Sequence, residues 1–152
     1  MRTLACLAAL MSLATPQLAA AEGCPRTADG VKALLAGRTV TSTQKEGGFA
    51  ADGFSTYEGS GFVLGMTPIG YELQTKRGQV RELRVYLPVT SVEPLSYAFR
   101  NAHSGATCGA DECKWEKSGG ALGALNRATM METIYKRGAM TLWCFYTNDA
   151  GW

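Results

Sequence analysis

The sequence predicts a single α+β domain, built mainly from an antiparallel β-sheet with two short helices and two disulfides. Three observations support this prediction. Short runs of alternating apolar and polar residues, rich in Val, Thr, Tyr and Phe, are separated by Gly-containing turns. Two other segments have their apolar residues at helical spacing. The cysteines that follow an N-terminal export signal are even in number, which in a small exported domain indicates disulfides.

The first residues, MRTLACLAALMSLATPQLAAA, have the pattern of a cleaved secretory signal peptide. Arg2 is followed by an apolar run that is too short for the ~20 residues of a membrane-spanning helix. Small residues precede a predicted cleavage after Ala21. We therefore expect residues 1–21 to be a signal peptide and residues 22–152 to form one periplasmic or secreted domain, without membrane insertion. An alternative is a lipoprotein that is acylated on Cys24.

The chain has five cysteines, and the first of them leaves with the signal peptide. The remaining four, which allow three pairings, are Cys24, Cys108, Cys113 and Cys144. We predict Cys108–Cys113, because these two are close in sequence, and Cys24–Cys144, which then ties the N-terminus to the last strand. In the chain-entropy treatment the short loop contributes ~2 kcal/mol and a loop of about 120 residues approaches ~5 kcal/mol. The long bridge should stabilise the fold, and the short one should mainly shape its loop.

The first predicted helix is TADGVKALLAG, residues 27–37. It should start near Thr27 or Asp29, which are good N-terminal caps, and stop at Gly37. The next stretch, RTVTSTQKE at residues 38–46, alternates Val and Thr residues as a strand does. A Gly-rich loop should follow this strand.

Two further stretches, residues 55–65 and 68–88, predict strands. The second is a hairpin that turns at Arg77 and Gly78. Its alternation is expected to place two sets of apolar residues on one face, Ile69, Tyr71 and Leu73 against Leu83, Val85 and Leu87. Four antiparallel strands are expected in this half of the chain.

The second predicted helix is VEPLSYAFRNAH, residues 92–103. Pro94 is suited to the first helical position, and Leu95 and Phe99 have helical spacing. The segment 119–136 is open between helix and strand. For residues 129–148 we prefer a hairpin over a helix ending at a glycine, because Thr, Ile, Tyr, Trp and Phe are concentrated there.

A faint internal repeat suggests that the domain has two similar halves. Five residues recur at one fixed spacing: Glu72, Lys76, Arg77, Gly78 and Tyr86 reappear as Glu132, Lys136, Arg137, Gly138 and Tyr146. If this similarity reflects the structure, each half should contain one helix and one set of strands related by an approximate two-fold axis.

Several classes of chemistry do not fit the sequence. His103 is the only histidine, which excludes metal sites and mechanisms that need two. The cysteines lack the paired close spacing of a structural zinc site and the C-x-x-C of a redox motif. The Gly-rich runs match neither the phosphate-binding nor the dinucleotide-binding pattern. With 15 Lys and Arg against 13 Asp and Glu, no basic stripe indicates a nucleic-acid surface. We therefore expect no cofactor, no metal and no nucleic-acid partner.

The stretch CGADECKW, residues 108–115, is the best candidate for a binding site. Its disulfide would hold Asp111 and Glu112 in a rigid loop with Trp115 beside them. A pre-ordered loop avoids ~0.5–1.5 kcal/mol per side chain that binding would otherwise immobilise, and Trp is common at binding hot spots. We predict that these three residues bind a basic protein partner. The alternative is that the bridge only fixes a crossover and that Trp115 packs in the core.

Together these features predict an exported, non-catalytic binding protein, an inhibitor or immunity protein that blocks a cell-wall hydrolase or another exported toxin through its stapled loop. In format, meaning signal peptide, about 130 mature residues, β-rich domain and paired cysteines, the chain resembles the periplasmic lysozyme inhibitors. This resemblance implies no site residue. The alternatives are a small secreted hydrolase that uses His103 and Glu58 as an acid–base pair, or an accessory subunit of an envelope assembly. Without a catalytic function, His103 should be a partly solvated residue stabilised by the dipole of its helix.

Overall fold

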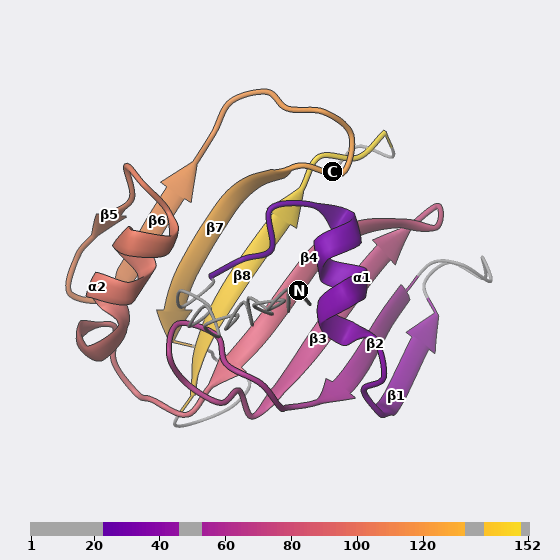
Figure 1. The fold of residues 1–152 in the computed structure, drawn as a ribbon, viewed down its shortest axis with the longest axis horizontal. Helices are drawn as coiled ribbons and strands as arrows, with labels where there is room; N and C mark the ends of the chain where they lie inside the picture. The colour runs from indigo at the N-terminus through magenta and orange to yellow at the C-terminus, as the bar shows by residue number, and fades with distance from the viewer. Residues whose placement is uncertain (1–22, 46–52, 133–138, 150–152) are drawn as a thin grey trace, which may run out of the picture.

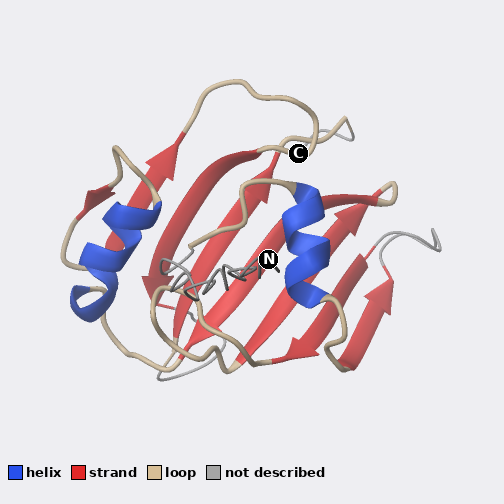
Figure 2. Ribbon diagram, in the orientation of Figure 1, coloured by secondary structure: helices blue, strands red, loops and turns tan. Residues whose placement is uncertain are grey.

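The computed structural model describes residues 23–45, 53–132 and 139–149. Within them, one antiparallel sheet of eight strands has two helices on one of its faces (Figures 1 and 2). The elements are α1 (Ala28–Leu35), β1 (Val40–Lys45), β2 (Gly53–Glu58), β3 (Gly70–Lys76), β4 (Gln79–Leu87), α2 (Glu93–Ala102), β5 (Thr107–Cys108), β6 (Glu112–Glu116), β7 (Leu125–Glu132) and β8 (Met140–Tyr146). The predicted α+β class is confirmed. The predicted signal peptide lies outside the described residues.

Both helices begin and bury their side chains much as their sequences indicate. The side chain of Thr27, not of Asp29, caps α1 by accepting a hydrogen bond from a backbone N–H in the first turn. Pro94 lies in the first turn of α2. Each helix buries an apolar pair in the same core: Val31 and Leu35 from α1, and Leu95 and Phe99 from α2. None of the helices in the described part of the chain is long and apolar enough to span a bilayer.

The hairpin of β3 and β4 has the predicted turn. Arg77 and Gly78 both have positive φ, 52° and 72°, as a two-residue type I′ turn requires. Tyr71 pairs with Val85 in the predicted register. The prediction for Ile69 is wrong, because this residue precedes β3, and its side chain is 50% exposed.

The strand predicted over residues 55–65 is only partly correct, since β2 ends at Glu58. Gly59 lies so close to the neighbouring backbone that a Cβ there would be 2.1 Å from the carbonyl oxygen of Pro68. The chain then leaves the sheet and forms a small turn closed by a bridge between Val63 and Met66. This turn packs near α2 and forms one wall of a groove described below.

The C-terminal hairpin is confirmed for the residues that the structure describes. β7 and β8 pair antiparallel, with Ala128 opposite Cys144 and Met130 opposite Leu142. Of the segment left open above, residues 125–132 are therefore strand. Residues 133–138 lie outside the described part of the chain.

Both predicted disulfides are present. Cys24–Cys144 joins the N-terminal segment to β8 across 120 residues, and Cys108–Cys113 joins β5 to β6 across 5. Because the sulfur of Cys24 is bonded to another sulfur, it is not available for the thioether lipid of a lipoprotein. Buried cysteines of the long bridge also belong to the core under the helices.

The domain consists of two similar halves, each with one helix followed by a four-stranded meander. The sheet order β1-β2-β3-β4-β8-β7-β6-β5 places β4 beside β8 at the centre. Both helices lie on the same face of the sheet (Figure 1). The approximate two-fold axis therefore passes through the sheet, and equivalent residues of the two halves must lie on the same face. The sequence repeat does not satisfy this condition. Its Tyr86 lies on the face away from the helices, beside Glu72, whereas Tyr146 lies on the helix side and donates to the Pro25 carbonyl. The repeated residues are therefore not structural equivalents.

Candidate functional site

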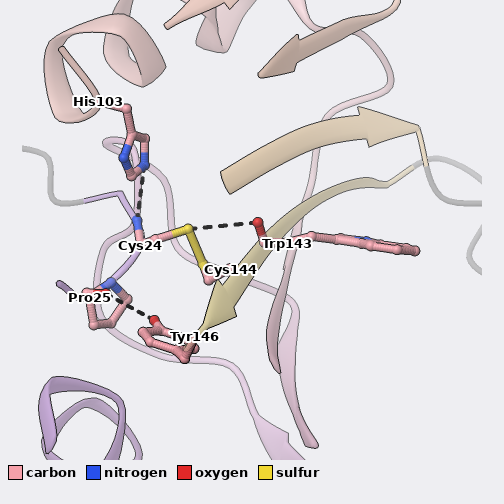
Figure 3. The surroundings of a disulfide bond; sticks show 6 residues. All are labelled: Cys24, Pro25, His103, Trp143, Cys144 and Tyr146. Carbon is pink, nitrogen blue, oxygen red and sulfur yellow. Dashed lines mark hydrogen bonds between the residues drawn. A yellow bond between two sulfur atoms is a disulfide. The ribbon is translucent and has the colours of Figure 1, made fainter. Parts of the chain in front are cut away.

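The face of the sheet opposite the helices carries three rows of side chains that cross the strands. We call it the open face. From β2 to β6, the strand register gives a first row of Phe54, Gln74, Glu82, Phe145, Arg127 and Glu116. The middle row is Thr56, Glu72, Arg84, Trp143, Thr129 and Lys114. The third row is Glu58, Gly70, Tyr86, Thr141, Met131 and Glu112. Figure 3 shows the Trp143 side chain pointing away from the Cys24–Cys144 bridge, toward this face.

Arg84 is at the centre of the open face and contacts four side chains. Its Nη1 donates to Glu72 Oε1 at 2.8 Å, and its Nε donates to Glu82. Its guanidinium carbon lies 4.8 Å from the centre of the Trp143 ring and 5.6 Å from that of Phe54. These residues come from β2, β3, β4 and β8, so only the assembled sheet brings them together. We call this group the arginine cluster.

Electrostatics fix the protonation of the cluster. Burial lowers the pKa of Arg84, but the carboxylates of Glu82 and Glu72 act in the opposite direction, and the net effect raises it. The pKa of Tyr86 is raised by burial and by the neighbouring Glu72 carboxylate, to which its hydroxyl donates. The tyrosine is therefore a neutral hydrogen-bond donor and the arginine a permanent cation. One guanidinium faces two carboxyl groups in this cluster.

A hollow of about 250 Å³ lies beside the arginine cluster. It is lined by Ser42, Phe54, Thr56, Glu72 and Arg84. The Ser42 hydroxyl donates to that of Thr56 at 3.1 Å. The hollow therefore offers hydroxyl, carboxylate, guanidinium and ring surfaces in one place, which suits a side chain of a docked protein.

A second stacked arginine extends the cluster toward β7. The guanidinium carbon of Arg127 lies 4.0 Å from the centre of the Phe145 ring, and this ring is 6.0 Å from that of Trp143. Arg, Trp and Tyr are the residues most enriched at hot spots of protein interfaces. The open face concentrates them at its centre, which is where hot spots are usually found.

Some buried polar atoms near the centre of this face have no hydrogen-bond partner within the described residues. They include Oγ1 of Thr141 and Nε1 of Trp143. A buried polar group without a partner costs about 1–3 kcal/mol. A water molecule or partner group that reached these atoms would recover part of that cost.

Acidic side chains outnumber basic ones in the three rows. The rows contain five glutamates, Glu58, Glu72, Glu82, Glu112 and Glu116, and three basic residues, Arg84, Arg127 and Lys114. Lys114 Nζ lies 2.6 Å from Glu112 Oε1, so this lysine is already engaged. These three rows therefore have an acidic excess, although the whole chain has a formal charge of +2.

The structure does not gather Asp111, Glu112 and Trp115 on one surface. Side chains three apart in a strand point to opposite faces, so Glu112 belongs to the open face and Trp115 to the helix side. The Trp115 Nε1 donates to the Ser104 carbonyl at 3.1 Å, and its ring lies 5.5 Å from that of His103. Asp111 is exposed at the tip of the stapled loop. Only Glu112 of the three shares a face with the arginine cluster.

His103 is fully buried, so the expectation of a partly solvated residue is wrong. It follows α2 and lies 4.8 Å from the Phe99 ring, and its Nε2 accepts the Cys24 N–H at 3.3 Å (Figure 3). Burial, and secondarily the charge of Arg26, lower its pKa to about 4. The imidazole is therefore neutral near pH 7 and is a packing and hydrogen-bonding residue.

The structure also separates His103 from Glu58, its partner in the hydrolase alternative. Glu58 lies in β2 on the open face, whereas His103 packs against Trp115 of β6 on the helix side. These strands are five positions apart in the sheet, which at about 4.8 Å per strand corresponds to about 24 Å. The two side chains cannot act on one substrate in this arrangement.

No protein-family model, curated protein or solved structure matches this chain. Among the residues described, no three His, Cys, Asp or Glu side chains are grouped so that they could hold a metal ion. The arginine cluster was not predicted from the sequence. One signal was present, since ELRVY at residues 82–86 alternates charged or aromatic side chains with apolar ones. This pattern indicates a strand whose charged and aromatic side chains share one face and can contact one another there.

Proposed function

We propose that this protein is an exported, non-catalytic binding protein whose open face docks onto a basic protein partner. In this proposal it acts in the periplasm or outside the cell as an inhibitor or immunity protein, and its target is a cell-wall hydrolase or another exported toxin. The observation that carries the proposal is the arginine cluster, in which Arg84 is held between two aromatic rings and two carboxylates at the centre of a face that neither helix covers. Two disulfides support a location outside the reducing cytoplasm.

Preorganisation of the arginine cluster supports binding at this site. The arginine cluster is held by hydrogen bonds and ring contacts before any partner arrives, so binding need not immobilise these long side chains at a cost of ~0.5–1.5 kcal/mol each. The paired charges also present fixed donors and acceptors. Such a surface selects a partner by the match of its polar groups and rings.

The acidic excess of the three rows supports a basic partner. Glu58 and Glu116 are exposed toward opposite edges of the face, and Glu112 lies next to the stapled loop. Carboxylates at the rim of an interface attract a positively charged protein during its approach. The stapled loop carries Asp111 at its tip and extends this acidic rim beyond β6. It therefore contributes to the proposed surface through its acids, whereas Trp115 fixes the loop from behind.

The test uses the processed, oxidised protein against a panel of basic cell-wall hydrolases and exported toxins from its source. Affinity is measured by calorimetry, and inhibition by release of dye from labelled cell wall. We expect at least one tight complex, which Trp143→Ala weakens tenfold or more because the ring is removed from the centre of the interface. Tyr97→Ala, an aromatic truncation in α2 on the helix side, should leave the affinity unchanged.

Folding of each variant is checked by circular dichroism and thermal unfolding. If Trp143→Ala does not fold, Arg84→Lys provides a second variant that keeps the charge and loses the two-sided stacking. The proposal fails if no panel member binds, or if a complex forms and neither variant of the arginine cluster weakens it.

A further inference from the structure

A groove of about 590 Å³ lies on the helix side of the molecule, away from the open face. Three segments form its walls. They are residues 23–26, which we call the N-terminal strap, the turn at Leu64 and Gly65, and the side of α2 from Tyr97 to Ala102. Cavities that bind small molecules usually measure about 300–1,000 Å³. The groove is therefore large enough for such a ligand.

The N-terminal strap is a fixed wall. Cys24 is held by the disulfide to β8, and its N–H donates to the buried His103. The carbonyl of the next residue, Pro25, accepts the Tyr146 hydroxyl at 2.9 Å (Figure 3). A Cβ on Gly23 would lie 2.4 Å from His103 Nε2, so the strap is packed as closely as a glycine allows. The groove therefore exists before any ligand binds.

The opposite wall contains backbone strain. Leu64 has φ of 50°, a left-handed conformation that usually belongs to Gly or Asn, yet its side chain is buried. Holding a bulky residue in this conformation is unfavourable, and such strain is concentrated at functional sites. Two backbone hydrogen bonds between Val63 and Met66 maintain the turn. The turn brings Leu64 and Gly65 to the groove wall, while the Leu64 side chain anchors this wall in the core.

The lining is apolar with one positive end. Ala98 and Ala102 provide a smooth wall on α2, and Tyr97, which is 72% exposed, presents its ring at the rim. Arg26 is the charged residue of the lining, and its Nη2 donates to the Ala102 carbonyl at 2.6 Å, which holds the guanidinium at the end of the groove. An apolar cavity with a few well-placed polar groups is the usual form of a small-molecule site.

We propose that this groove binds a small amphipathic anion, an apolar ring system or short acyl chain that carries one carboxylate or sulfonate. The apolar body lies between Leu64 and α2, and the anionic group meets Arg26. The observation behind this assignment is the combination of a preformed apolar groove, a strained apolar wall residue and, among the described residues that line the groove, one fixed cation. The site is independent of the open face and of the proposed protein partner.

The test uses 1-anilinonaphthalene-8-sulfonate, an aromatic anion that fluoresces in apolar sites, with the processed and unreduced protein. We expect saturable fluorescence with one site per chain. Ala98→Leu, which fills the groove, should weaken binding tenfold or more. Arg26→Gln, which removes the cation, should weaken it about fivefold, and this second effect should shrink as salt is added.

Arg100→Gln is the matched control, because Arg100 is an exposed cation of α2 that does not line the groove. It should leave the affinity unchanged, and all variants should keep the thermal stability of the parent to within a few degrees. Absence of a saturable signal overturns the proposal. So does a signal that neither Ala98→Leu nor Arg26→Gln alters, or one that Trp143→Ala on the open face removes.

Discussion

The environment of His103 shows how strongly a single residue depends on its tertiary contacts. At the end of a surface helix, a histidine would ordinarily be hydrated and gain from the helix dipole. Here the N-terminal strap, Phe99 and Trp115 enclose it instead. Enclosure makes the charged form unfavourable, so the residue acts as a neutral acceptor for the Cys24 N–H.

This environment predicts a pH dependence of stability. The pKa of His103 is about 4 in the folded protein and near 6.5 when the residue is unperturbed. Between these values the unfolded chain binds the extra proton, so the free energy of unfolding should be highest above pH 6.5 and fall as the pH drops toward 4. The loss attributable to this residue is of the order of 3 kcal/mol.

The measurement is urea unfolding above and within that pH window, for the parent and for His103→Gln. Glutamine keeps an acceptor for the Cys24 N–H but cannot titrate. The free energy of unfolding of the variant should depend less on pH than that of the parent. The difference between the two proteins is due to His103, because the carboxylates that titrate in a similar pH range are present in both. Equal pH dependence in the two proteins would contradict the buried, neutral histidine.

At the level of elements, the two disulfides have different consequences because they close loops of different length. The Cys24–Cys144 bridge spans 120 residues and crosses the core, whereas Cys108–Cys113 spans 5 and joins the two strands at one edge of the sheet. The longer the closed loop, the more conformational entropy the bridge removes from the unfolded chain.

We predict that replacing both Cys24 and Cys144 by Ala lowers the free energy of unfolding by about 4–5 kcal/mol, and that the same change at Cys108 and Cys113 lowers it by about 2 kcal/mol. Chemical denaturation of the two variants under identical conditions measures both values. Equal losses would show that unfolded-state entropy is not the main contribution of the long bridge. A larger loss from the short bridge would contradict its assignment as a shaping element.

The elements themselves follow largely from local sequence. Thr27 caps α1, Pro94 lies in the first turn of α2, and Arg77 with Gly78 turns the central hairpin. These features depend on contacts within a few residues, so a local pattern is sufficient to predict them. Ile69 was misplaced because its exposure depends on where β3 begins, and that boundary is set by the loop before it and by packing.

For the whole molecule, the arrangement of charge separates the two proposed sites. The open face has five glutamates against three basic residues in its rows, whereas the groove under α2 has Arg26 as its charge. The sheet lies between them, so each site can bind without displacing the other. A protein with both sites would respond to a partner on one face and a small anion on the other.

If the open face binds a basic partner, its rim should govern the rate of association. Replacing Glu58 and Glu116 together by Gln should lower the association rate constant about three- to tenfold at low salt, with little change in dissociation. The difference should largely disappear at about 0.5 M salt, where exposed charges are screened within a few ångströms. Glu93→Gln in α2, on the helix side, is the control in stopped-flow measurements. A change confined to dissociation would contradict electrostatic steering.

The sequence predicted two similar halves from a short repeat of identical residues, and the structure does not support that repeat as the reason. The helix-plus-meander order does repeat, but the repeated tyrosines, Tyr86 and Tyr146, lie on opposite faces of the sheet. Side chains at adjacent positions in a strand point to opposite faces of the sheet. A sequence repeat whose spacing differs by one residue from that of the structure therefore matches residues on opposite faces. A short run of identical residues cannot establish equivalence without that register.

The sequence by itself was sufficient to predict the fold class and the two helices, and to favour the hairpins and the pairing of the cysteines that the structure has, because periodicity, caps, turns and cysteine spacing are local or countable properties. Only the tertiary structure decided which side chains meet. β4 and β8 are far apart in the chain, and their pairing brings Arg84 beside Trp143. The pairing of β6 with β7 likewise places Glu112, and not Trp115, on the face of the arginine cluster. The physical reason is that face and register in an antiparallel sheet are set by the packing of the whole core, which no short segment contains.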